Sequence, residues 1–395
     1  MSNHNVLPIV LSSLAWLCVV IAVWPLLRLL LPYRITSKNK KRKGLFRVHD
    51  SGNTATDVSV IVYCDNNAQG LENVITMLKE QTTEGNTEII IACDPVNESL
   101  KDMCKILHHT YPDIYITYVP EDTKNISRKK LALNLGIKAA RNDILIFVDS
   151  NTLILSDNWL DSVKKGFNSG TEILIAPVKP MLYLKGSVFN LARLTDYVID
   201  TLTWISAAIR GHCFRGHSYN LAYRKSLFLR HNGFSSSLNY HYGDDDMFIS
   251  RVAEIHNVQV NIDDVGLIGI TYNSVDELER EMRRRMFTIK GIGRGSRIVS
   301  GMLYILIWVN FISGLLGIVY GSSSLLLMLL AIFAIVFMWL MLSVIMIFAS
   351  RFIDVRLNPF QLISGFFVSP FLYLQRYIKM YGERSTQMTW VRLKK

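Results

Sequence analysis

Two groups of acidic and amide side chains in this sequence could bind a metal ion and move a proton. The first consists of Asp149 and Asn151, which are two residues apart and directly follow the apolar run from Ile144 to Val148. A carboxylate and a second oxygen ligand at this spacing can face one divalent ion, because Mg²⁺ takes one or two protein carboxylates and completes its shell with phosphates and water. The ion would neutralise negative charge on a departing diphosphate. We therefore expect a Mg²⁺ or Mn²⁺ site at Asp149 and Asn151.

The second group is a run of three consecutive acids after Gly243, namely Asp244, Asp245 and Asp246. Like charges this close repel and raise one another's pKa, so the run is costly to pack. One interpretation is that one of the three acids is a general base in the same cleft as Asp149. The alternative is a solvated loop or the first turn of a helix, where acids interact favourably with the helix dipole.

An alternation of buried strands and amphipathic helices would position these side chains. Short β-branched runs predict strands, and apolar residues at helical spacing predict the helices between them. The expected strands are 58–63, 88–93, 114–119 and 144–148, and the expected helices are 71–79, 100–109 and 126–141. Strands that alternate with helices pair in parallel through right-handed crossovers, which gives a Rossmann-like α/β half. Ligands of such sheets bind beyond the carboxyl ends of the strands.

Polar side chains follow three of the expected strands. Asn66 comes after the first strand, Asp94 after the second and Asp149 after the fourth. Together they could form a crevice for a base, a ribose and a metal-bound diphosphate. Asp and Asn also favour turns and helix caps, which is the structural alternative for each of them. The sequence contains no GxGxxG motif and no P-loop motif, which counts against a dinucleotide fingerprint and against a P-loop nucleotide site.

Four arginines gather shortly before the second apolar run: Arg280, Arg283, Arg284 and Arg285. They could clamp phosphates, since guanidinium groups match phosphate oxygens bidentately. Contact with lipid headgroups beside a membrane span would also explain them. His212 and His217 have no metal-ligand spacing with Cys213, so we expect them to be loop residues or to support the residues that touch the ligand.

The composition counts against two broad classes of protein. Half of the 395 residues are hydrophobic and 19% are charged, whereas a disordered chain has low hydrophobicity and a high charge density. The apolar residues cluster in long runs, which indicates membrane spans and counts against a purely soluble protein. The five cysteines form no CxxC pair and indicate buried thiols in a reducing compartment.

Three apolar runs are long enough, at about 20 residues per span, to cross a bilayer. They are Leu7 to Tyr33, Gly301 to Tyr320 and Leu325 to Ala349. The first is too long for a signal-peptide core and no small-residue cleavage site follows it, so we expect an uncleaved anchor. A further apolar segment, Pro359 to Met380, is interrupted by Gly365 and Pro370. It could be re-entrant, interfacial or spanning, and we expect the interfacial arrangement.

The positive charge follows the apolar runs. The formal net charge of +11 is the difference between 43 Lys and Arg and 32 Asp and Glu. Much of it lies directly after the first run, at Lys38, Lys40, Lys41, Arg42, Lys43 and Arg47. Basic residues beside a span mark its cytoplasmic side and attract anionic headgroups, and no aromatic stacking pattern accompanies them. We therefore expect a multi-pass protein of the inner (cytoplasmic) membrane with its catalytic domain in the cytoplasm, and no nucleic-acid partner.

The expected domain organisation has five parts. They are an N-terminal transmembrane anchor (1–34), a basic juxtamembrane linker (35–56), an α/β domain (57–297), a transmembrane hairpin (298–350), and an interfacial or re-entrant segment with a basic tail (351–395).

The order of these motifs resembles that of the membrane-anchored family-2 glycosyltransferases with the GT-A fold, particularly those of bacterial envelopes. The resemblance covers about residues 57–290. The strand that begins at Val58 is similar to the family's opening strand, with Tyr63 in place of the usual proline. Asp149 stands at the first position of the family's DxD motif, and Asn151 replaces the second aspartate. The run from Gly243 to Asp246 matches the acidic motif that supplies the catalytic base.

The resemblance implies a fold, a donor and a set of residue roles. The fold is a GT-A, Rossmann-like nucleotide-sugar domain flanked by transmembrane helices, and the donor is a nucleotide-diphosphate sugar. Residues implied in nucleotide-sugar binding are Asn66, Asp94, Lys130, Asn134, Asp149 and Arg285. Residues implied in the pocket for the donor sugar and the acceptor are Gly216, His217 and Asn220. The implied base is Asp245, with Asp244 and Asp246 as alternatives one residue away.

The implied activity is an inverting transfer of a sugar to a lipid-linked or envelope glycan acceptor at the cytoplasmic membrane face, within polysaccharide biosynthesis. The QxxRW motif of processive synthases keeps Arg285 here and lacks its Gln and Trp, so single-sugar transfer is expected. The altered metal motif leaves a second possibility, a catalytically inactive membrane scaffold with the same fold. A transporter is not expected, because the spans show no buried charges or paired broken helices that would form a solute path.

Overall fold

The computed structural model describes residues 6–41, 56–94, 98–121, 123, 126–182, 188–238, 240, 242–272 and 274–382. The chain divides into two compact units. The α/β unit contains the described parts of Thr36–Leu182, Ala207–Ile292 and Met380–Lys395. The helical unit contains the described parts of Met1–Ile35, Tyr183–Ser206 and Gly293–Lys379.

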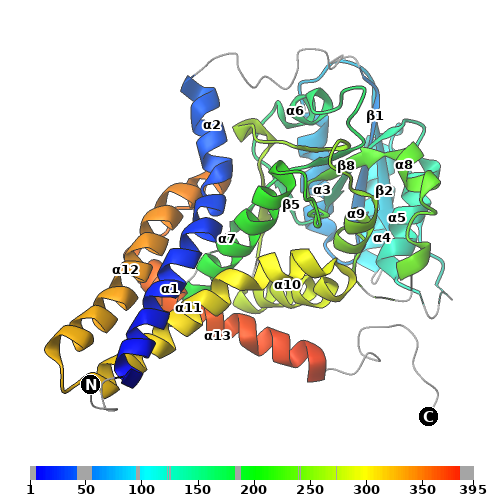
Figure 1. Cartoon of the computed structure of the whole chain (residues 1–395). Helices are drawn as coiled ribbons and strands as arrows, with labels where there is room; N and C mark the ends of the chain where they lie inside the picture. Colours follow the sequence, from blue (N-terminus) through cyan, green and yellow to red (C-terminus); the bar gives the residue numbers. More distant parts are fainter. Residues whose placement is uncertain are drawn as a thin grey trace, which may run out of the picture. The chain divides into compact units, whose positions relative to one another are not determined.

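The centre of the α/β unit is a seven-stranded sheet with the order β3-β2-β1-β4-β8-β6-β9 (Figure 1). Its first four strands are β1 (Val58–Cys64), β2 (Thr87–Cys93), β3 (Tyr115–Tyr118) and β4 (Ile144–Asp149). They pair in parallel, with Val60 opposite Ile89 on one side and opposite Ile146 on the other. Every residue of β1 and β4 is buried, as expected for strands that are covered on both faces. The predicted parallel half of the sheet is therefore confirmed.

Helices connect these strands as predicted. They are α3 (Ala68–Lys79), α4 (Glu98–Thr110) and α5 (Arg128–Ala139). Asn67 caps α3 by accepting a hydrogen bond from the Gly70 amide, and Ser127 caps α5 by accepting one from the Lys130 amide. Short polar side chains at these positions satisfy amides that have no partner inside the helix. The two caps therefore define where the chain leaves β1 and enters α3, and where α5 begins.

The second half of the α/β unit, for which no strands were predicted, does not continue the alternation of the first half. Strand β8 (Leu221–Arg224) is antiparallel to both β4 and β6 (Ile173–Ile175), and β6 pairs in parallel with β9 (Val258–Val260). A separate three-stranded sheet has the order β5-β10-β7, formed by Thr152–Ile154, Ile268–Thr271 and Val178–Met181. The remaining α-helices of this unit are α2 (Leu31–Lys41, from Thr36 on), α6 (Trp159–Lys165), α8 (Lys225–Arg230), α9 (Asp246–Val252) and α10 (Val275–Thr288).

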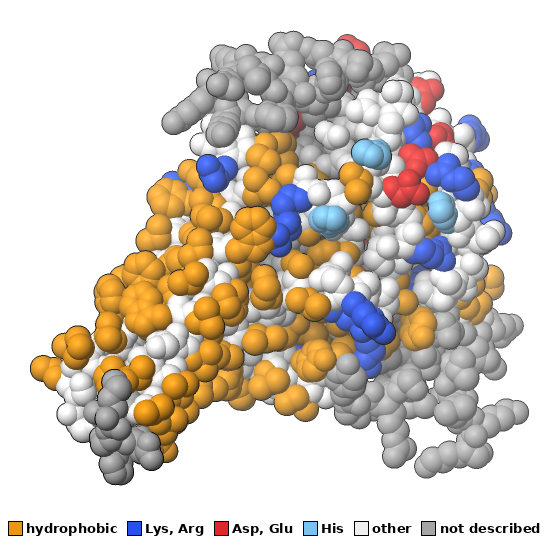
Figure 2. All heavy atoms as spheres, in the orientation of Figure 1, with side chains coloured by type: hydrophobic (Ala, Val, Ile, Leu, Met, Phe, Trp, Pro, Cys, Tyr) orange, Lys and Arg blue, Asp and Glu red, His pale blue; other side chains and the backbone are white. Residues whose placement is uncertain are grey.

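The helical unit contains the three predicted apolar runs as long helices, α1 (Val6–Leu29), α11 (Arg294–Tyr320) and α12 (Leu325–Ala349). By length and composition, each of them could cross a membrane; α12 continues into a short 3-10 turn that ends at Ile353. They lie side by side (Figure 1), and their outward-facing side chains are largely hydrophobic, as Figure 2 shows at lower left. A membrane is the environment that fits such a surface.

Two more helices complete the helical unit and alter the predicted domain boundaries. Helix α7 (Val188–Ile209) lies mostly in this unit, so the predicted continuous domain 57–297 is interrupted by Tyr183–Ser206. Helix α13 (Pro359–Gly382) continues through Pro370 and is not among the helices apolar enough to span a membrane in the described part of the chain. Most of the predicted basic linker and the basic tail, at 42–55 and 383–395, lie outside the described residues.

Candidate active site

A pocket opens in the α/β unit at the carboxyl ends of β1 and β4, where ligands of parallel sheets bind. Three of the predicted site residues line it together: Asp149, Asp244 and Asp245. The other lining residues are Tyr63, Lys129, Leu133, Phe147, Val148, Ser218, Leu221, Tyr223 and Phe234. The structure therefore brings the aspartate after β4 and the acidic run into one cavity, although many residues separate them in the sequence.

A chain of hydrogen bonds orients the Asp149 carboxylate. Asp149 Oδ1 accepts hydrogen bonds from the backbone amide of Asn151 and from its Nδ2, both at 3.0 Å. Asn151 Oδ1 in turn accepts a hydrogen bond from Asn67 Nδ2 at 2.7 Å, while Asn67 Oδ1 is occupied by the Gly70 amide at 2.9 Å. Because the cap of α3 determines which end of the Asn67 amide faces Asn151, it also determines that Asn151 presents its NH₂ group to Asp149.

Gly70 makes this chain possible. A Cβ atom at this position would lie 2.1 Å from the carbonyl oxygen of Ser150 and 2.2 Å from Asn67 Nδ2. Any side chain would push the first turn of α3 away from the turn after β4. The glycine therefore brings the helix cap within hydrogen-bonding distance of the Asp149–Asn151 turn.

At this turn, Asp149 offers a carboxylate oxygen that could bind a divalent cation. Asp149 Oδ2 takes no hydrogen bond from the described part of the chain, so it is available to an ion. The Asn151 oxygen accepts a hydrogen bond from Asn67, and the Asn151 NH₂ group donates to Asp149, so Asn151 orients the carboxylate; its role as a metal ligand stays a prediction. Within the described residues, no group of three or more His, Cys, Asp or Glu side chains could hold a metal ion. A single carboxylate that shares its ion with substrate phosphates is a known arrangement for Mg²⁺.

The charge state of Asp149 reflects its burial. Burial raises the pKa of Asp149 to about 6, against the opposing effect of the Lys129 ammonium. A buried carboxylate with a raised pKa is stabilised in its charged form when a cation binds beside it.

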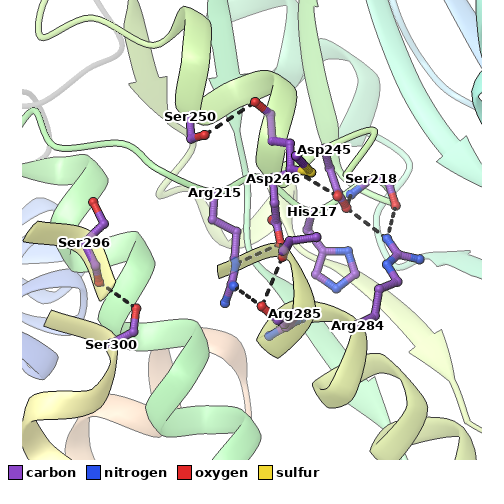
Figure 3. Close-up of polar contacts among 12 residues, drawn as sticks. Arg215, His217, Ser218, Asp245, Asp246, Ser250, Arg284, Arg285, Ser296 and Ser300 are labelled. Atoms are coloured by element: carbon purple, nitrogen blue, oxygen red, sulfur yellow. Dashed lines mark hydrogen bonds and ion pairs between the residues drawn. The ribbon is translucent and has the colours of Figure 1, made fainter. Parts of the chain in front are cut away.

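The three consecutive acids have three different environments. Asp244 Oδ2 lies 3.1 Å from Lys129 Nζ. Asp245 Oδ2 accepts hydrogen bonds from the Ser218 amide at 3.1 Å and from Arg284 Nη2 at 3.0 Å, as Figure 3 shows, and its Oδ1 accepts one from the Asp246 amide. Gly243 precedes them with a φ of +94°, a conformation that favours glycine and turns the chain into α9.

Asp246 faces away from the pocket. Its Oδ2 accepts a hydrogen bond from Arg215 Nε at 3.1 Å (Figure 3). The same oxygen accepts one from Thr288 Oγ1 at 2.5 Å. Burial raises the pKa of Asp246 to about 7, against the opposing effect of Arg215. Asp246 thus ties α9 to α10 and to the loop before β8, and it is the least suited of the three acids to act on a bound substrate.

Asp245 is held as a carboxylate anion. Burial alone would raise its pKa, but Arg284 and Lys129 outweigh that effect and hold the pKa well below its usual range. This residue lines the pocket, as the resemblance implied, and its basicity is suppressed by the guanidinium that it accepts from.

Lys129, which no sequence motif marked, lines the pocket, and the predicted Lys130 does not. Lys129 Nζ lies 3.2 Å from Ser218 Oγ and close to the ring faces of Tyr63 and Tyr219, at 5.2 and 5.7 Å from their centroids. Lys130 is fully buried, and its Nζ donates to the carbonyl oxygens of Ser237, Tyr240 and Tyr242 at 2.5, 3.2 and 2.7 Å. The predicted role of Lys130 in nucleotide binding is therefore replaced by one in holding the loop before the acidic run.

The two adjacent arginines at the end of α10, Arg284 and Arg285, also have different partners. Arg284 reaches Asp245 and lies over the Tyr242 ring, 5.8 Å from its centroid. Arg285 is buried and donates from Nε to Glu281 Oε1 at 3.2 Å, and it does not line the pocket. Arg284 does not line the pocket itself, but it donates to Ser218 and Asp245, which do, whereas the predicted Arg285 does not contact them.

The residues predicted for the donor sugar and the acceptor, Gly216, His217 and Asn220, are not among those that line the pocket. Asn220 is buried, donates to the carbonyl oxygens of Pro177 and Gly266, and accepts from Trp159 Nε1, so its side chain is committed to the fold. A Cβ atom at Gly216 would lie 3.1 Å from a Leu221 methyl, which indicates close packing.

His217 is buried with its Nε2 3.9 Å from Glu281 Oε1, and neither ring nitrogen has a hydrogen-bond partner in the described part of the chain. Burial lowers the pKa of His217 to about 3.

The remaining predicted nucleotide-binding residues lie near the carboxyl ends of the strands or on α5, outside the pocket lining. Asp94 follows β2 and accepts from Arg128, with Nη2 at 2.6 Å and Nε at 2.9 Å from its Oδ1. Asn66 is exposed after β1, and Asn134 is half-buried on α5, where Leu133 lines the pocket instead.

Comparison with known proteins agrees with this architecture. The sequence model of the family described as Glycosyl transferase family 2 matches residues 59–180. A search of curated proteins found no significant match. Among solved structures, the mannosyltransferase PcManGT from Pyrobaculum calidifontis, in complex with GDP-Man and Mn²⁺, is similar with a TM-score of 0.60 and 13% identity over 93% of this chain and 99% of that chain.

Two further structures align at lower similarity. TarS from S. aureus, in complex with UDP-GlcNAc, has a TM-score of 0.40 and 13% identity over 84% of this chain and 93% of that chain. Glucosyl-3-phosphoglycerate synthase from Mycobacterium tuberculosis, in complex with Mn²⁺, UDP-Glc and phosphoglyceric acid, has a TM-score of 0.40 and 16% identity over 62% and 83%.

Proposed function

The chain has the GT-A fold with a glycosyltransferase family 2 region at residues 59–180, and from this premise we propose that it transfers a sugar from a nucleotide-diphosphate sugar to an acceptor hydroxyl. The observation that carries the proposal is the shared pocket of Asp149, Lys129 and Asp245 at the carboxyl ends of β1 and β4. Asp149 and Lys129 supply groups that would bind a metal-bound diphosphate, and Asp245 supplies a carboxylate that can accept a proton.

The donor diphosphate is placed beside Asp149 and the ammonium of Lys129. Asp149 Oδ2 would hold Mg²⁺ or Mn²⁺, and a bound ion would neutralise charge on the leaving diphosphate. The structurally similar mannosyltransferase was solved with Mn²⁺, which supports this choice of ion. Asn151 and Asn67 hold the carboxylate in position, and positioned charge of this kind supplies much of the catalysis in group-transfer sites.

Asp245 is the proposed base. It would accept the proton of the acceptor hydroxyl while that oxygen attacks the anomeric carbon from the face opposite the leaving diphosphate. The new glycosidic bond forms as the bond to the diphosphate oxygen breaks, so the configuration at the anomeric carbon is inverted. Asp244 and Asp245 line the pocket, whereas Asp246 is held outside it by Arg215 and Thr288, and the register of the acidic motif favours Asp245 as the base.

The acceptor is proposed to be lipid-linked or a glycan of the cell envelope, with the site at the cytoplasmic face of the inner membrane. Support comes from α1, α11 and α12, which could anchor the protein in a bilayer. The lack of Gln and Trp around Arg285 supports transfer of a single sugar per binding event.

The experiment is a screen of nucleotide-sugar donors with Mn²⁺ or Mg²⁺ and a membrane lipid extract, in which release of nucleoside diphosphate is measured on the full-length protein in detergent. We expect release with one class of donor, and its loss in Asp149→Ala and Asp245→Asn. Full activity of either variant would contradict its assigned role. Absence of metal-dependent nucleotide binding by calorimetry would instead favour the second candidate, an inactive membrane scaffold, which the altered metal motif at Asn151 supports.

A further inference from the structure

Two cations and two anions meet around the hydroxyl of Ser218. Lys129 Nζ lies 3.2 Å and Arg284 Nη2 lies 3.3 Å from Ser218 Oγ. Each cation is also paired with one acid, Lys129 with Asp244 at 3.1 Å and Arg284 with Asp245 at 3.0 Å. The side chains of all four are at least four-fifths buried, so water screens these charges little.

In this arrangement the Asp245 carboxylate is a weak base. Its Oδ1 accepts from the Asp246 amide, and its Oδ2 accepts from both the Ser218 amide and Arg284. The guanidinium is the one charged donor among these three, and a charge-assisted hydrogen bond is about twice as strong as a neutral one. Removal of Arg284 from Oδ2 would therefore free a lone pair and raise the basicity of the carboxylate.

Arg284 is also the guanidinium best placed to meet a diphosphate. Its Nη2 lies 3.3 Å from Ser218 Oγ, and Ser218 lines the pocket together with Asp149. A guanidinium matches phosphate oxygens bidentately, so a diphosphate beside Asp149 would compete with Asp245 for Arg284. Arg285 is not available for this exchange, because it is buried and donates to Glu281.

We propose that Arg284 is a positioning residue that passes from Asp245 to the donor diphosphate when the donor binds, so that Asp245 becomes an effective base only in the donor complex. The inference rests on the proposed function and adds to it an order of events. The donor must bind before the acceptor can be deprotonated, which limits unproductive chemistry in the donor-free protein.

Competition for Arg284 predicts that one substitution increases nucleotide affinity, whereas substitutions in a binding site usually decrease it. If Asp245 and the diphosphate share one guanidinium, then Asp245→Asn releases Arg284 and strengthens nucleoside diphosphate binding, while it abolishes transfer. Couplings between two such sites are typically about 5-fold or more, so we expect a gain in affinity of at least about 5-fold. The gain requires Arg284, so it should be absent when Arg284→Gln is already present.

The experiment is calorimetry of UDP and of GDP, each with Mn²⁺, on the full-length protein in detergent. The variants are Asp245→Asn, Arg284→Gln, their combination, and Arg284→Lys, with Arg280→Gln as a control for loss of an exposed arginine on the same helix. We expect weaker binding in Arg284→Gln, partial recovery in Arg284→Lys, and wild-type binding in Arg280→Gln. Thermal unfolding of each variant tests whether it is folded.

Each remaining outcome overturns the inference in a recognisable way. If Asp245→Asn increases nucleotide affinity equally with and without Arg284, then the carboxylate acts only through the electrostatic repulsion between its charge and the diphosphate. Unchanged affinity in Arg284→Gln would mean that Arg284 only anchors Asp245. Binding of neither nucleotide by the wild-type protein would remove the proposed function together with this inference. If the wild-type protein binds nucleotide and transfers sugar, but all variants bind nucleotide with equal affinity, this inference alone is removed.

Discussion

The buried ammonium of Lys130 provides a test of how the loop before the acidic run is held. We consider Lys130→Met, which keeps the length and apolar character of the side chain and removes its three hydrogen-bond donors. Lys130 Nζ donates to the carbonyl oxygens of Ser237, Tyr240 and Tyr242, and the side chain is fully buried on α5. Lys138 is exposed on the same helix, so Lys138→Met serves as the matched control.

The magnitude follows from two opposing effects. Burial lowers the pKa of Lys130 from 10.5 to about 8, and this difference corresponds to a cost of about 3 kcal/mol for the charged form at neutral pH. Three hydrogen bonds from a charged donor contribute about 1.5–3 kcal/mol each, which methionine loses. The difference is a destabilisation of about 1.5–6 kcal/mol, which lowers the midpoint of thermal unfolding by about 3–24 °C in a unit of this size.

The assay is thermal unfolding of the detergent-solubilised protein, combined with calorimetry of nucleoside diphosphate with Mn²⁺. We expect Lys130→Met to unfold at lower temperature, Lys138→Met to match the wild type, and the folded Lys130→Met protein to keep a measurable affinity for the nucleotide. An unchanged unfolding temperature with loss of nucleotide binding would refute the reasoning, because it would show that Lys130 contacts the nucleotide and does not hold the loop.

Two further predictions concern residues that support the pocket. Asn67→Asp keeps an oxygen that caps α3 but loses the NH₂ group donated to Asn151, so we expect wild-type stability and several-fold weaker Mn²⁺-dependent nucleotide binding; equal affinity would show that the amide chain does not orient Asp149. His217 has a pKa of about 3 in the folded protein and 6.5 ordinarily, so the unfolded chain binds more protons between these values and wild-type stability falls as pH decreases through that window. His217→Phe lacks this contribution, and its unfolding temperature should fall less between pH 7 and pH 5, whereas parallel curves would contradict the assignment.

The first half of the α/β unit could be predicted from the sequence, and the second half could not. Strands β1, β2 and β4 are buried runs of six or seven residues, long enough to show their pattern. Strands β5, β6 and β9 have three residues each, and β7 contains Pro180, so no periodicity marks them. Their pairing is non-local and depends on contacts that no short window of sequence contains.

The same contrast holds for the site. Asp149 could be placed because it ends a recognisable strand, and the acidic run because three consecutive acids are unusual in a packed protein. The role of Asn151 could not be found, since it depends on the direction of the Asn67 amide, which the Gly70 amide sets. That arrangement is visible only when the cap of α3 and the turn after β4 are seen together.

The errors of one residue at Lys130 and Arg285 have a common physical origin. Successive side chains on a helix point about 100° apart, so adjacent cations cannot face the same cavity. On α5, Lys130 is buried on the same side of the helix as Ile137, which follows it by seven residues, or about two turns. On α10, Arg285 lies on the buried stripe with Leu278, Glu281 and Met282.

Each cation on a buried stripe must find its partners inside the fold, because an isolated buried charge is too costly. Lys130 donates to three carbonyl oxygens and Arg285 donates to Glu281. One position away, Lys129 lines the pocket and Arg284 pairs with the pocket-lining Asp245. The helical spacing of apolar residues therefore indicates which of two adjacent cations is buried in the fold, and a family motif alone does not. When a motif places a ligand-binding cation on a helix, the cation that lies on the apolar stripe should be assigned to the fold, and its neighbour at the edge of the stripe should be assigned to the ligand.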